Sequence, residues 1–463
     1  MTIASLLKRT TDHALDYLAS LDDRSIAPTA SLAELRAAFV KPLPEKGMPA
    51  DQIIDALVND VETGLLGSTS GRFFGWVIGG TLPAALAADW LTTIWDQNAA
   101  IYACGPAEAV VEEVCGQWLK QLLGIPASAS FALVTGCQMA HATALAAARH
   151  KLLADRGWDV ETNGLAGSTP LRMLTSERRH ESLIRAIKFL GIGQAAIEFV
   201  GCESDGQMRM TDLEAALQNA ADTPTIVCLQ AGDIHTGGFD PFPEACDIAH
   251  SYGAWVHIDG AFGLWVATSD RLRHLLSGAE RADSWATDGH KWLNVPFDSG
   301  FAFVAQSAAH RAAMSQTASY RISVGDARDQ IDWTPEWSRR GRGFPAYAAI
   351  KSLGRAGIAQ LVEQCCDHAR RLVTEISALP GAELVVTPRI NQGLVRFLSP
   401  DGDHDRRTDR IIERIQAKGT AWFGGTTWQN KRVMRVSVCN WRTSDRDIDR
   451  AISSVREVLS EIS

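Results

Sequence analysis

The sequence predicts an α/β protein in which a large domain with a mostly parallel sheet precedes a smaller α+β domain. The chain has 463 residues, 46% of them apolar and 21% charged, which is enough for a large core and for two or three domains. Residues 131–304 alternate short apolar runs with helical patterns, as a parallel sheet covered on both faces does. The last third of the chain has a different pattern, in which strands stand among longer helices.

The strands expected in the large domain are short, nearly continuous apolar runs. In chain order they cover residues 131–135, 171–175, 196–200, 225–230, 254–259, 282–287 and 299–305. Helical patterns stand between them at 138–153, at 181–190, in a segment that Thr211 and Asp212 open, and at 243–252. Because helices separate the apolar runs, most of the strands are expected to run parallel.

The C-terminal third predicts a smaller α+β fold. A long helical pattern covers about residues 346–378. Strands are expected after it at 383–387, 394–398 and 433–438, and helices at 405–417 and 445–461. We therefore divide the chain into an N-terminal helical segment at 1–70, a large α/β domain at 71–335 and a small C-terminal α+β domain at 336–463.

Charge and cysteine content exclude several classes of protein. A formal net charge of -9 argues against a nucleic-acid partner. Nine cysteines, an odd number without a C-x-x-C pair, indicate reduced thiols. The N-terminus reaches Lys8 and Arg9 after a very short apolar stretch, so we recognise no secretory signal. We expect a cytoplasmic protein whose partner is a small molecule or another protein.

One uncharged stretch raises the question of a membrane span. Residues 125–148 contain no Asp, Glu, Lys or Arg, and their length suits a bilayer. Pro126, Gly136, Gln138 and His141 do not suit a span. We interpret the stretch as a buried strand, a turn and a buried helix, and expect no membrane partner.

Two charged residues stand at expected strand ends. Asp259, in HIDGAFGLW at 257–265, ends a very apolar strand, where ligands bind in open α/β sheets. Lys291 follows the next strand, and partial burial is expected to lower the pKa of its amine and allow a Schiff base. Each residue has an ordinary interpretation too, because Asp259 can cap a helix or turn and Lys291 can extend to solvent. Together, the amine and a carboxylate that holds a pyridinium nitrogen fit a pyridoxal 5'-phosphate (PLP) site.

Two further motifs fit the same cofactor. The segment VTGCQMAHATALAAARH at 134–150 combines a strand, a glycine turn and a helix start, whose free amides can bind an anion. Gly136, Cys137 and Gln138 are therefore candidates for holding the cofactor phosphate. His180 follows a strand by a few residues, and its imidazole can stack on the cofactor ring. Taken alone, the first motif is better explained as an ordinary strand–helix turn, and a helix-start histidine explains the second equally well.

In this order, the motifs resemble those of the group II PLP-dependent decarboxylases, a family that includes the aromatic amino acid, glutamate and diaminobutyrate decarboxylases. The matching patterns are TGCQ…LAAAR, H-x-S-x-x-x-A, H-x-D-x-A and A-D-S-x-x-x-D-x-H-K-W, and the resemblance covers about residues 70–440. It implies the PLP-dependent transferase fold of the aspartate aminotransferase type. It also implies PLP as the cofactor and a homodimer whose active sites lie at the interface.

The resemblance implies a role for each matched residue. Lys291 would carry the Schiff base, Asp259 would pair with the pyridine nitrogen, and Ala261 would pack beneath the ring. His180 would stack on the opposite ring face. The residues expected around the phosphate or elsewhere at the cofactor are Gly136, Cys137, Gln138, Ser284 and His290.

Tyr320 lies in the polar segment 315–342, whose weak periodicity predicts a mobile loop. The resemblance implies that a loop tyrosine at this place protonates the substrate α-carbon after CO2 leaves. The chain has only five tyrosines, so we favour this role over that of a surface tyrosine. The expected catalytic residues are Lys291, His180, Tyr320 and Asp259.

The chain departs from the family pattern around the expected phosphate site. Many relatives have G-G-S or G-G-T where Cys137 and Gln138 stand here, so a side-chain hydroxyl is missing. Relatives often have Asn-Pro where Asp288 and Gly289 stand. An acidic residue close to a phosphate is unfavourable unless it points away.

A second departure concerns the segment AGDIHTGGFD at 231–240, which replaces a G-T-T turn. Asp233 and His235 are therefore candidates to face the substrate or the cofactor. The twelve histidines form no H-x-H or H-E-x-x-H pattern, so no metal is expected.

The expected reaction is decarboxylation of an L-amino acid to the corresponding amine and CO2. Phe73, Phe74, Trp76 and Trp95 lie where the family shapes its pocket and hint at an aromatic substrate, although core packing explains them as well. Alternatives on the same fold are an aldehyde-forming or other lyase, or an aminotransferase in which Arg435 binds the α-carboxylate. A non-catalytic PLP-binding protein is the least favoured alternative.

Overall fold

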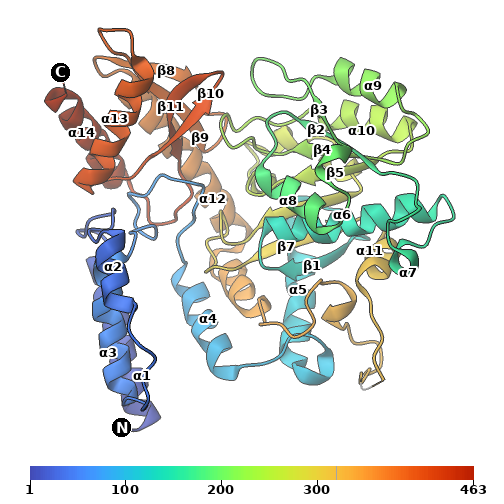
Figure 1. The fold of residues 1–463 in the computed structure, drawn as a ribbon, viewed down its shortest axis with the longest axis horizontal. Coiled ribbons are helices and arrows are strands. Elements are labelled where there is room, and N and C mark those ends of the chain that lie inside the picture. The colour runs from blue at the N-terminus through green and yellow to red at the C-terminus, as the bar shows by residue number, and fades with distance from the viewer. Residues whose placement is uncertain (320, 463) are drawn as a thin grey trace. The chain divides into compact units, whose positions relative to one another are not determined.

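The computed structural model describes residues 1–319 and 321–462, which form two compact units (Figure 1). The larger unit comprises Gly79–Arg370 and Val386–Gly393. The smaller unit comprises Met1–Ile78, Arg371–Val385 and the chain from Leu394. The three-part division at 1–70, 71–335 and 336–463 stays a prediction.

A seven-stranded sheet forms the centre of the larger unit, in the order β1-β7-β6-β5-β4-β2-β3. β7 pairs antiparallel with both β1 and β6, whereas the neighbouring pairs from β6 to β3 are parallel. The predicted large, mostly parallel sheet is therefore confirmed. The strands are β1 Ser130–Val134, β2 Arg172–Ser176, β3 Ile197–Val200, β4 Thr225–Gln230, β5 Trp255–Asp259, β6 Ser284–Asp288 and β7 Gly300–Val304.

The helices of the larger unit include those that separate the parallel strands. They are α4 Pro83–Trp95, α5 Pro106–Leu123, α6 Cys137–Ala154, α7 Val160–Asn163, α8 Glu181–Phe189, α9 Met210–Gln218, α10 Phe242–Ser251 and α11 Ser307–Met314. The long helical segment α12, Gly343–Ser377, is interrupted by the non-helical backbone of Gly354. Helix α6 packs on β5, β6 and β7 and lies in front of the sheet in Figure 1.

The uncharged stretch 125–148 becomes β1 and most of α6. All five residues of β1 are buried, and α6 buries an alanine-rich surface. Small side chains let the helix approach the sheet closely. Because both elements are buried, charged residues are absent from this stretch. Within the described part of the chain, no helix has both the length and the apolar character needed to cross a bilayer.

The carboxyl edge of the sheet brings chemically active residues together. Asp259 is the last residue of β5 and Asp288 the last residue of β6. The two strands are parallel neighbours, and Asp259 is paired in register with Ala286. Helix α6 begins at Cys137, directly after the turn that follows β1. Acidic side chains and a helix N-terminus therefore share one edge, where ligands bind in open sheets.

The smaller unit has its own elements. Its N-terminal helices are α1 Ile3–Ser20, α2 Leu32–Phe39 and α3 Ala50–Val61. Its antiparallel strands have the order β10-β11-β9-β8, and its last two helices are α13 and α14. Their bounds are β8 Ala382–Val386, β9 Gln392–Phe397, α13 His404–Lys418, β10 Gly424–Trp428, β11 Lys431–Ser437 and α14 Asp445–Glu461. The expected small α+β fold is confirmed, with β10 as a strand that the sequence reading did not include.

Segment 315–342 is mostly irregular, as expected, apart from a short helical turn at Gln330–Asp332. Arg321 forms ion pairs with Asp329 and Asp332, with N–O distances of 2.9 and 2.8 Å. These ion pairs connect Arg321 to the short helical turn and to the residue before it. Its mobility stays a prediction, and Tyr320 lies outside the described residues.

Candidate active site

Asp259 is a buried carboxylate at the end of β5. Its Oδ1 accepts a hydrogen bond of 3.1 Å from the amide of Ala261, and its Oδ2 lies 3.5 Å from Nε2 of His141. Burial alone would raise the pKa of Asp259, but His141, through its charge and hydrogen bond, holds that pKa below its ordinary value together with His180 and Lys291. The carboxylate is therefore ionised at neutral pH.

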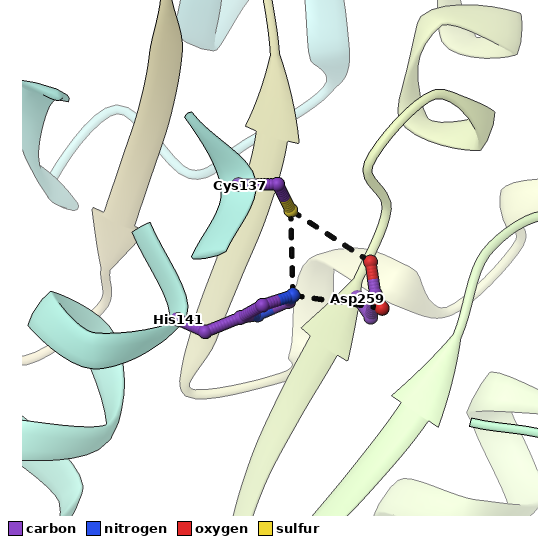
Figure 2. A group of neighbouring side chains, drawn as sticks. All are labelled: Cys137, His141 and Asp259. Atoms are coloured by element: carbon purple, nitrogen blue, oxygen red, sulfur yellow. Dashed lines mark hydrogen bonds and ion pairs between the residues drawn. The ribbon is translucent and has the colours of Figure 1, made fainter. Parts of the chain in front are cut away.

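Two side chains of α6 face this carboxylate. Cys137 and His141 are separated by one helical turn, so they lie on the same face of the helix. The Cys137 thiol lies 3.4 Å from Nε2 of His141 and 3.8 Å from Oδ1 of Asp259. Figure 2 shows the three side chains converging between α6 and β5. Burial raises the pKa of the Cys137 thiol well above its usual value, so the thiol keeps its proton.

Lys291 places a primary amine at the same edge of the sheet. Its Nζ lies 3.0 Å from Oδ2 of Asp288 and 5.8 Å from the ring centroid of Phe262. Burial acts to lower the pKa of Lys291, yet Asp288, Cys137 and Asp259 together raise it above its ordinary value. The expected lowering of this pKa is therefore wrong for the described structure, because a carboxylate pairs directly with the amine.

Asp288 connects three groups around the start of α6. Besides Lys291, its Oδ1 accepts a hydrogen bond of 2.5 Å from the amide of Cys137 and lies 3.4 Å from Nε2 of His290. His290 accepts a hydrogen bond from the amide of Ser299 on Nδ1, so its proton resides on Nε2, towards Asp288. Burial lowers the pKa of His290. Asp288 therefore points towards the helix N-terminus, not away from it.

The first turn of α6 offers backbone donors. Cys137 gives its amide to Asp288, while the amides of Gln138 and Met139 have no partner within the helix. A Cβ at Gly136 would lie 3.1 Å from Cε1 of His290 and 3.3 Å from Oδ1 of Asp288. A larger residue here would require His290 or Asp288 to move by a few tenths of an ångström. The N-terminus of an 18-residue helix with free amides is a favourable place for an anion.

The structure brings most of the predicted site residues together. Gly136, Cys137, Asp259, His290 and Lys291 share the carboxyl edge of the sheet through the contacts described above. Ala261 belongs to the same group, because its carbonyl accepts a hydrogen bond of 2.9 Å from the amide of Asp288.

His180 and Ser284 occupy different positions from these. His180 is exposed and caps α8, where its Nδ1 accepts from the amide of Ser182, and its charge acts on Asp259. Ser284 starts β6, at the opposite end of the strand from Asp288. Its hydroxyl is fully buried and lies 2.9 Å from Nδ1 of His257. The hydroxyl therefore contacts His257, and it does not lie at the start of α6, where the phosphate is expected.

The other candidates have separate environments. Asp233 accepts hydrogen bonds from the amides of His235 and Thr236, at 2.9 and 2.7 Å, so its carboxylate stabilises its own turn. Burial would raise the pKa of Asp233, but its contacts with His235 and Thr236 lower it. Arg435 is a buried residue of β11 in the smaller unit.

Two histidines escaped assignment from the sequence. His141 lies one helical turn after Cys137, and His257 lies two residues before Asp259, on the same face of β5. Nδ1 of His141 is 2.9 Å from Nε2 of His257, and both side chains are fully buried. The spacings of four on a helix and two on a strand are the signals that could have found them.

Cys137, His141 and Asp259 also form the donor set of a candidate metal centre. Their ligand atoms lie within 4.8 Å of one another, and all three residues are buried. Zinc sites use such donors, but a metal requires a thiolate, and burial keeps this thiol protonated. Hydrogen bonding accounts for the same arrangement.

A half-buried amine and an ionised carboxylate beside a helix N-terminus are the groups that a PLP-dependent enzyme needs. A family model described as "Pyridoxal-dependent decarboxylase conserved domain" matches residues 33–399, and the chain belongs to this family. It is a PLP-dependent carboxy-lyase, as the sequence predicted.

Individual relatives agree with this assignment. The chain is 26% identical to an aromatic-L-amino-acid decarboxylase of Bacillus atrophaeus, over 98% of this chain and 94% of the relative. It is 28% identical to the cysteine sulfinic acid decarboxylase of Mus musculus, over 82% of this chain and 80% of the relative. The crystal structure of Oryza sativa TDC with PLP and tryptamine superimposes with a TM-score of 0.93 at 22% identity, covering 99% of this chain and 98% of that one. The predicted fold is therefore confirmed.

The residues present fit PLP. Asp259 remains ionised in spite of burial and can pair with a pyridinium nitrogen. The Lys291 amine is close enough for its charge and that of Asp259 to act on one another. The free amides of Gln138 and Met139 suit the phosphate, although Asp288 has taken the first amide of the same turn.

Proposed function

We propose that this protein decarboxylates an aromatic L-amino acid to its amine and CO2, with Lys291 and Asp259 as the central groups. The observation that carries the proposal is the placement of this amine and this ionised carboxylate at one edge of the sheet, in a chain of the pyridoxal-dependent decarboxylase family. When bound, PLP supplies an aldehyde that amines attack and a protonated ring that accepts the electron pair left by CO2.

In this proposal Lys291 is the residue that would hold the cofactor, through its Nζ amine. Its Nζ must lose a proton to become a nucleophile. Asp288, 3.0 Å away, is the nearest described base for that proton. Its neighbour His290, with Nε2–H turned towards Asp288, stabilises the carboxylate by a further contact.

Asp259 keeps a proton on the ring nitrogen. An ionised carboxylate that accepts a charge-assisted hydrogen bond stabilises a pyridinium by about 1.5–3 kcal/mol. Ala261, Cys137 and His141 orient Asp259 from its own turn and from α6.

The remaining predicted residues take supporting roles. We assign His180 to the face of the cofactor ring, since its charge reaches Asp259. We assign Tyr320 to protonation of the substrate α-carbon. Gly136, Gln138 and the neighbouring amides of α6 are assigned to the phosphate. In this scheme substrate binding energy would serve to hold the substrate carboxylate in the orientation that its loss requires.

The aromatic substrate is proposed from the relatives. The Bacillus atrophaeus relative is named for aromatic L-amino acids, and the Oryza sativa structure contains tryptamine. The aromatic residues in this chain add little, because Phe73 stacks on Trp422 at 4.9 Å and Phe74 on Phe423 at 5.1 Å. Core packing therefore accounts for Phe73 and Phe74. The mouse relative, which is named for cysteine sulfinic acid, makes an acidic substrate the main competitor.

We also propose a cytoplasmic homodimer. Helix α4 exposes a cluster of large apolar side chains that a second copy of the chain would cover, with exposed fractions of 41% for Trp90, 44% for Leu91, 61% for Ile94 and 47% for Trp95. The nine cysteines are all free thiols, which suits a reducing compartment.

Product analysis tests the function directly. Purified protein loaded with PLP is incubated with Phe, Tyr, Trp, Glu, cysteine sulfinate and diaminobutyrate, and released CO2 and amine are measured. We expect equal amounts of CO2 and amine, with the highest kcat/KM for an aromatic substrate. A keto acid product would indicate an aminotransferase, and an aldehyde would indicate an aldehyde-forming lyase. Binding of PLP without turnover of any amino acid would contradict the proposal.

A further inference from the structure

A chain of buried polar groups leads from the core to Asp259. It begins at the indole of Trp255, whose Nε1–H donates a hydrogen bond of 2.9 Å to the hydroxyl of Ser284. That hydroxyl lies 2.9 Å from Nδ1 of His257, and Nε2 of His257 lies 2.9 Å from Nδ1 of His141. The last link is Nε2 of His141, 3.5 Å from Oδ2 of Asp259.

The local fold explains why these groups line up. Trp255, His257 and Asp259 alternate along β5 and therefore share one face of the strand. His257 is paired in register with Ser284 on β6. Helix α6 packs on β5 and β6 and adds His141 to the same layer. Residues from three elements, far apart in the sequence, form one continuous hydrogen-bonded path.

The two ends of the path fix the direction of its hydrogens. An indole N–H can only donate, and an ionised carboxylate can only accept. Burial, with a contribution from His141, lowers the pKa of His257 to about 3, so this imidazole is neutral. One arrangement then gives each acceptor in the path a donor: Ser284 donates to His257, His257 donates to His141, and His141 donates to Asp259. Every hydrogen then points towards the carboxylate.

The polarity of the path has an electrostatic consequence. Hydrogen bonds that point the same way polarise one another, and in a buried environment the effect is stronger than in water. The last donor, Nε2–H of His141, therefore favours the charged form of Asp259. An imidazole without the His257 contact could place its proton on Nδ1 instead, which would turn a lone pair towards the carboxylate.

We propose that Trp255, Ser284, His257 and His141 form a positioning chain that keeps Asp259 ionised and directed at the cofactor ring nitrogen. The proposal rests on the function proposed above and assigns Ser284 to the ring end of the cofactor. None of the four residues needs to touch substrate. Breaking the chain weakens the contact between Asp259 and the ring nitrogen and leaves the phosphate contacts unchanged.

A comparison of two cofactors that differ at the ring nitrogen can distinguish a positioning role of these residues from a purely structural one. We would measure the dissociation constants of PLP and of 1-deazapyridoxal phosphate, in which a carbon replaces the ring nitrogen, with apoenzyme prepared from the full-length protein. The ratio of the two constants reports the contact at the ring nitrogen. The variants are His257→Leu, which removes the donor to His141, and His257→Gln, whose amide can still donate. Ser284→Ala removes only a hydroxyl.

The wild type is expected to prefer PLP over the deaza compound. His257→Leu should reduce this preference on the order of tenfold, because the hydrogen bond between the Asp259 carboxylate and the ring nitrogen becomes weaker. Ser284→Ala should reduce it by about threefold, and His257→Gln should restore most of it. Binding of the deaza compound should be nearly the same in all variants.

His310 provides a matched control in the same unit. This histidine is also fully buried, its Nδ1 lies 2.9 Å from the hydroxyl of Ser130, and its Nε2 lies 2.8 Å from the carbonyl of Trp333. His310→Leu should lower stability without changing the preference for PLP. If His257→Leu and Ser284→Ala also leave the preference unchanged, the positioning chain is refuted. A wild type that binds both cofactors equally would instead refute the role proposed for Asp259. Should His257→Leu fail to fold, Ser284→Ala decides the matter.

Discussion

Asp259 and Asp288 end neighbouring parallel strands, yet their surroundings differ sharply. Asp259 has the amide of Ala261 and the side chains of Cys137 and His141 around it, groups that orient a carboxylate without neutralising it. Asp288 pairs directly with the Lys291 amine and with the first amide of α6. Two identical side chains at one sheet edge thus have different partners, which is why we propose different roles for them: Asp259 would pair with the ring nitrogen, and Asp288 holds the Lys291 amine.

The largest effect should come from the amine shared by these two environments. Lys291→Ala is expected to abolish turnover, at least ~10⁴-fold, because no other described amine stands at this edge to hold the cofactor covalently. Steady-state assays of CO2 release measure the loss. Lys120→Ala is a matched control, since Lys120 is another largely buried lysine, whose Nζ donates to the carbonyls of Ala127 and Ala129. Normal turnover by Lys291→Ala would remove this residue from the mechanism.

Tyr320→Phe tests the proposed proton donor to the substrate α-carbon. Loss of the phenolic proton should slow amine formation on the order of 100-fold, the usual contribution of a general acid. Part of the reaction should divert to an aldehyde with consumption of O2. Product analysis with an oxygen electrode measures both changes, and Tyr252→Phe serves as a control. Unchanged rate and product would make Tyr320 a bystander.

Asp259→Asn tests the ring end. An amide of the same shape keeps the packing but cannot hold a pyridinium, so kcat should fall about 10- to 100-fold, as expected for a charge-assisted hydrogen bond. Covalent attachment to Lys291 should persist. Measuring kcat at saturating PLP, together with borohydride trapping, separates the two effects. A variant with the wild-type kcat would show that the ring needs no ionised partner.

Asp288→Asn tests the carboxylate beside the start of α6. We expect this smaller change to raise the affinity for the cofactor. The carboxylate stands beside the amides that we assign to the phosphate, so a neutral amide should tighten PLP binding by about three- to tenfold. Equilibrium dialysis measures this change. Asp283→Asn is a control, because Asp283 immediately precedes β6 and its carboxylate contacts His250. Weaker PLP binding by Asp288→Asn would mean that the Asp288 charge supports the cofactor instead of repelling it.

Chelation should have no effect. Cys137, His141 and Asp259 present metal-ligand atoms, but the thiol keeps its proton and the histidine belongs to a hydrogen-bonded path. Activity after treatment with EDTA or phenanthroline should equal that of untreated enzyme, and metal analysis should find no stoichiometric zinc. A metal-dependent loss of activity would place a cation at the ring end and would contradict our interpretation of this cluster.

The large sheet could be predicted from the sequence because its strands are continuous apolar runs between helices. TIVCLQ, for example, is β4 as expected, and all of its residues are buried. In contrast, β10 consists of GGTTW and carries no apolar run, so its assignment depends on pairing with β11. Strands that are defined by a partner rather than by their own composition escape a reading of the sequence.

The site shows the same division. Asp259 and Lys291 could be recognised from strand ends and from family motifs, because both signals are local. The hydrogen bond from the amide of Cys137 to Asp288 depends on how closely α6 approaches the end of β6, which no local pattern encodes. The contact of His141 with His257 depends likewise on the packing of α6 against β5.

Peptide mapping tests the central claim most directly. The purified holoenzyme is reduced with borohydride and digested, and the modified peptide is sequenced by mass spectrometry. The account predicts a single phosphopyridoxyl group on Lys291, in near-stoichiometric amount. A modification on another lysine, or none at all, would contradict it.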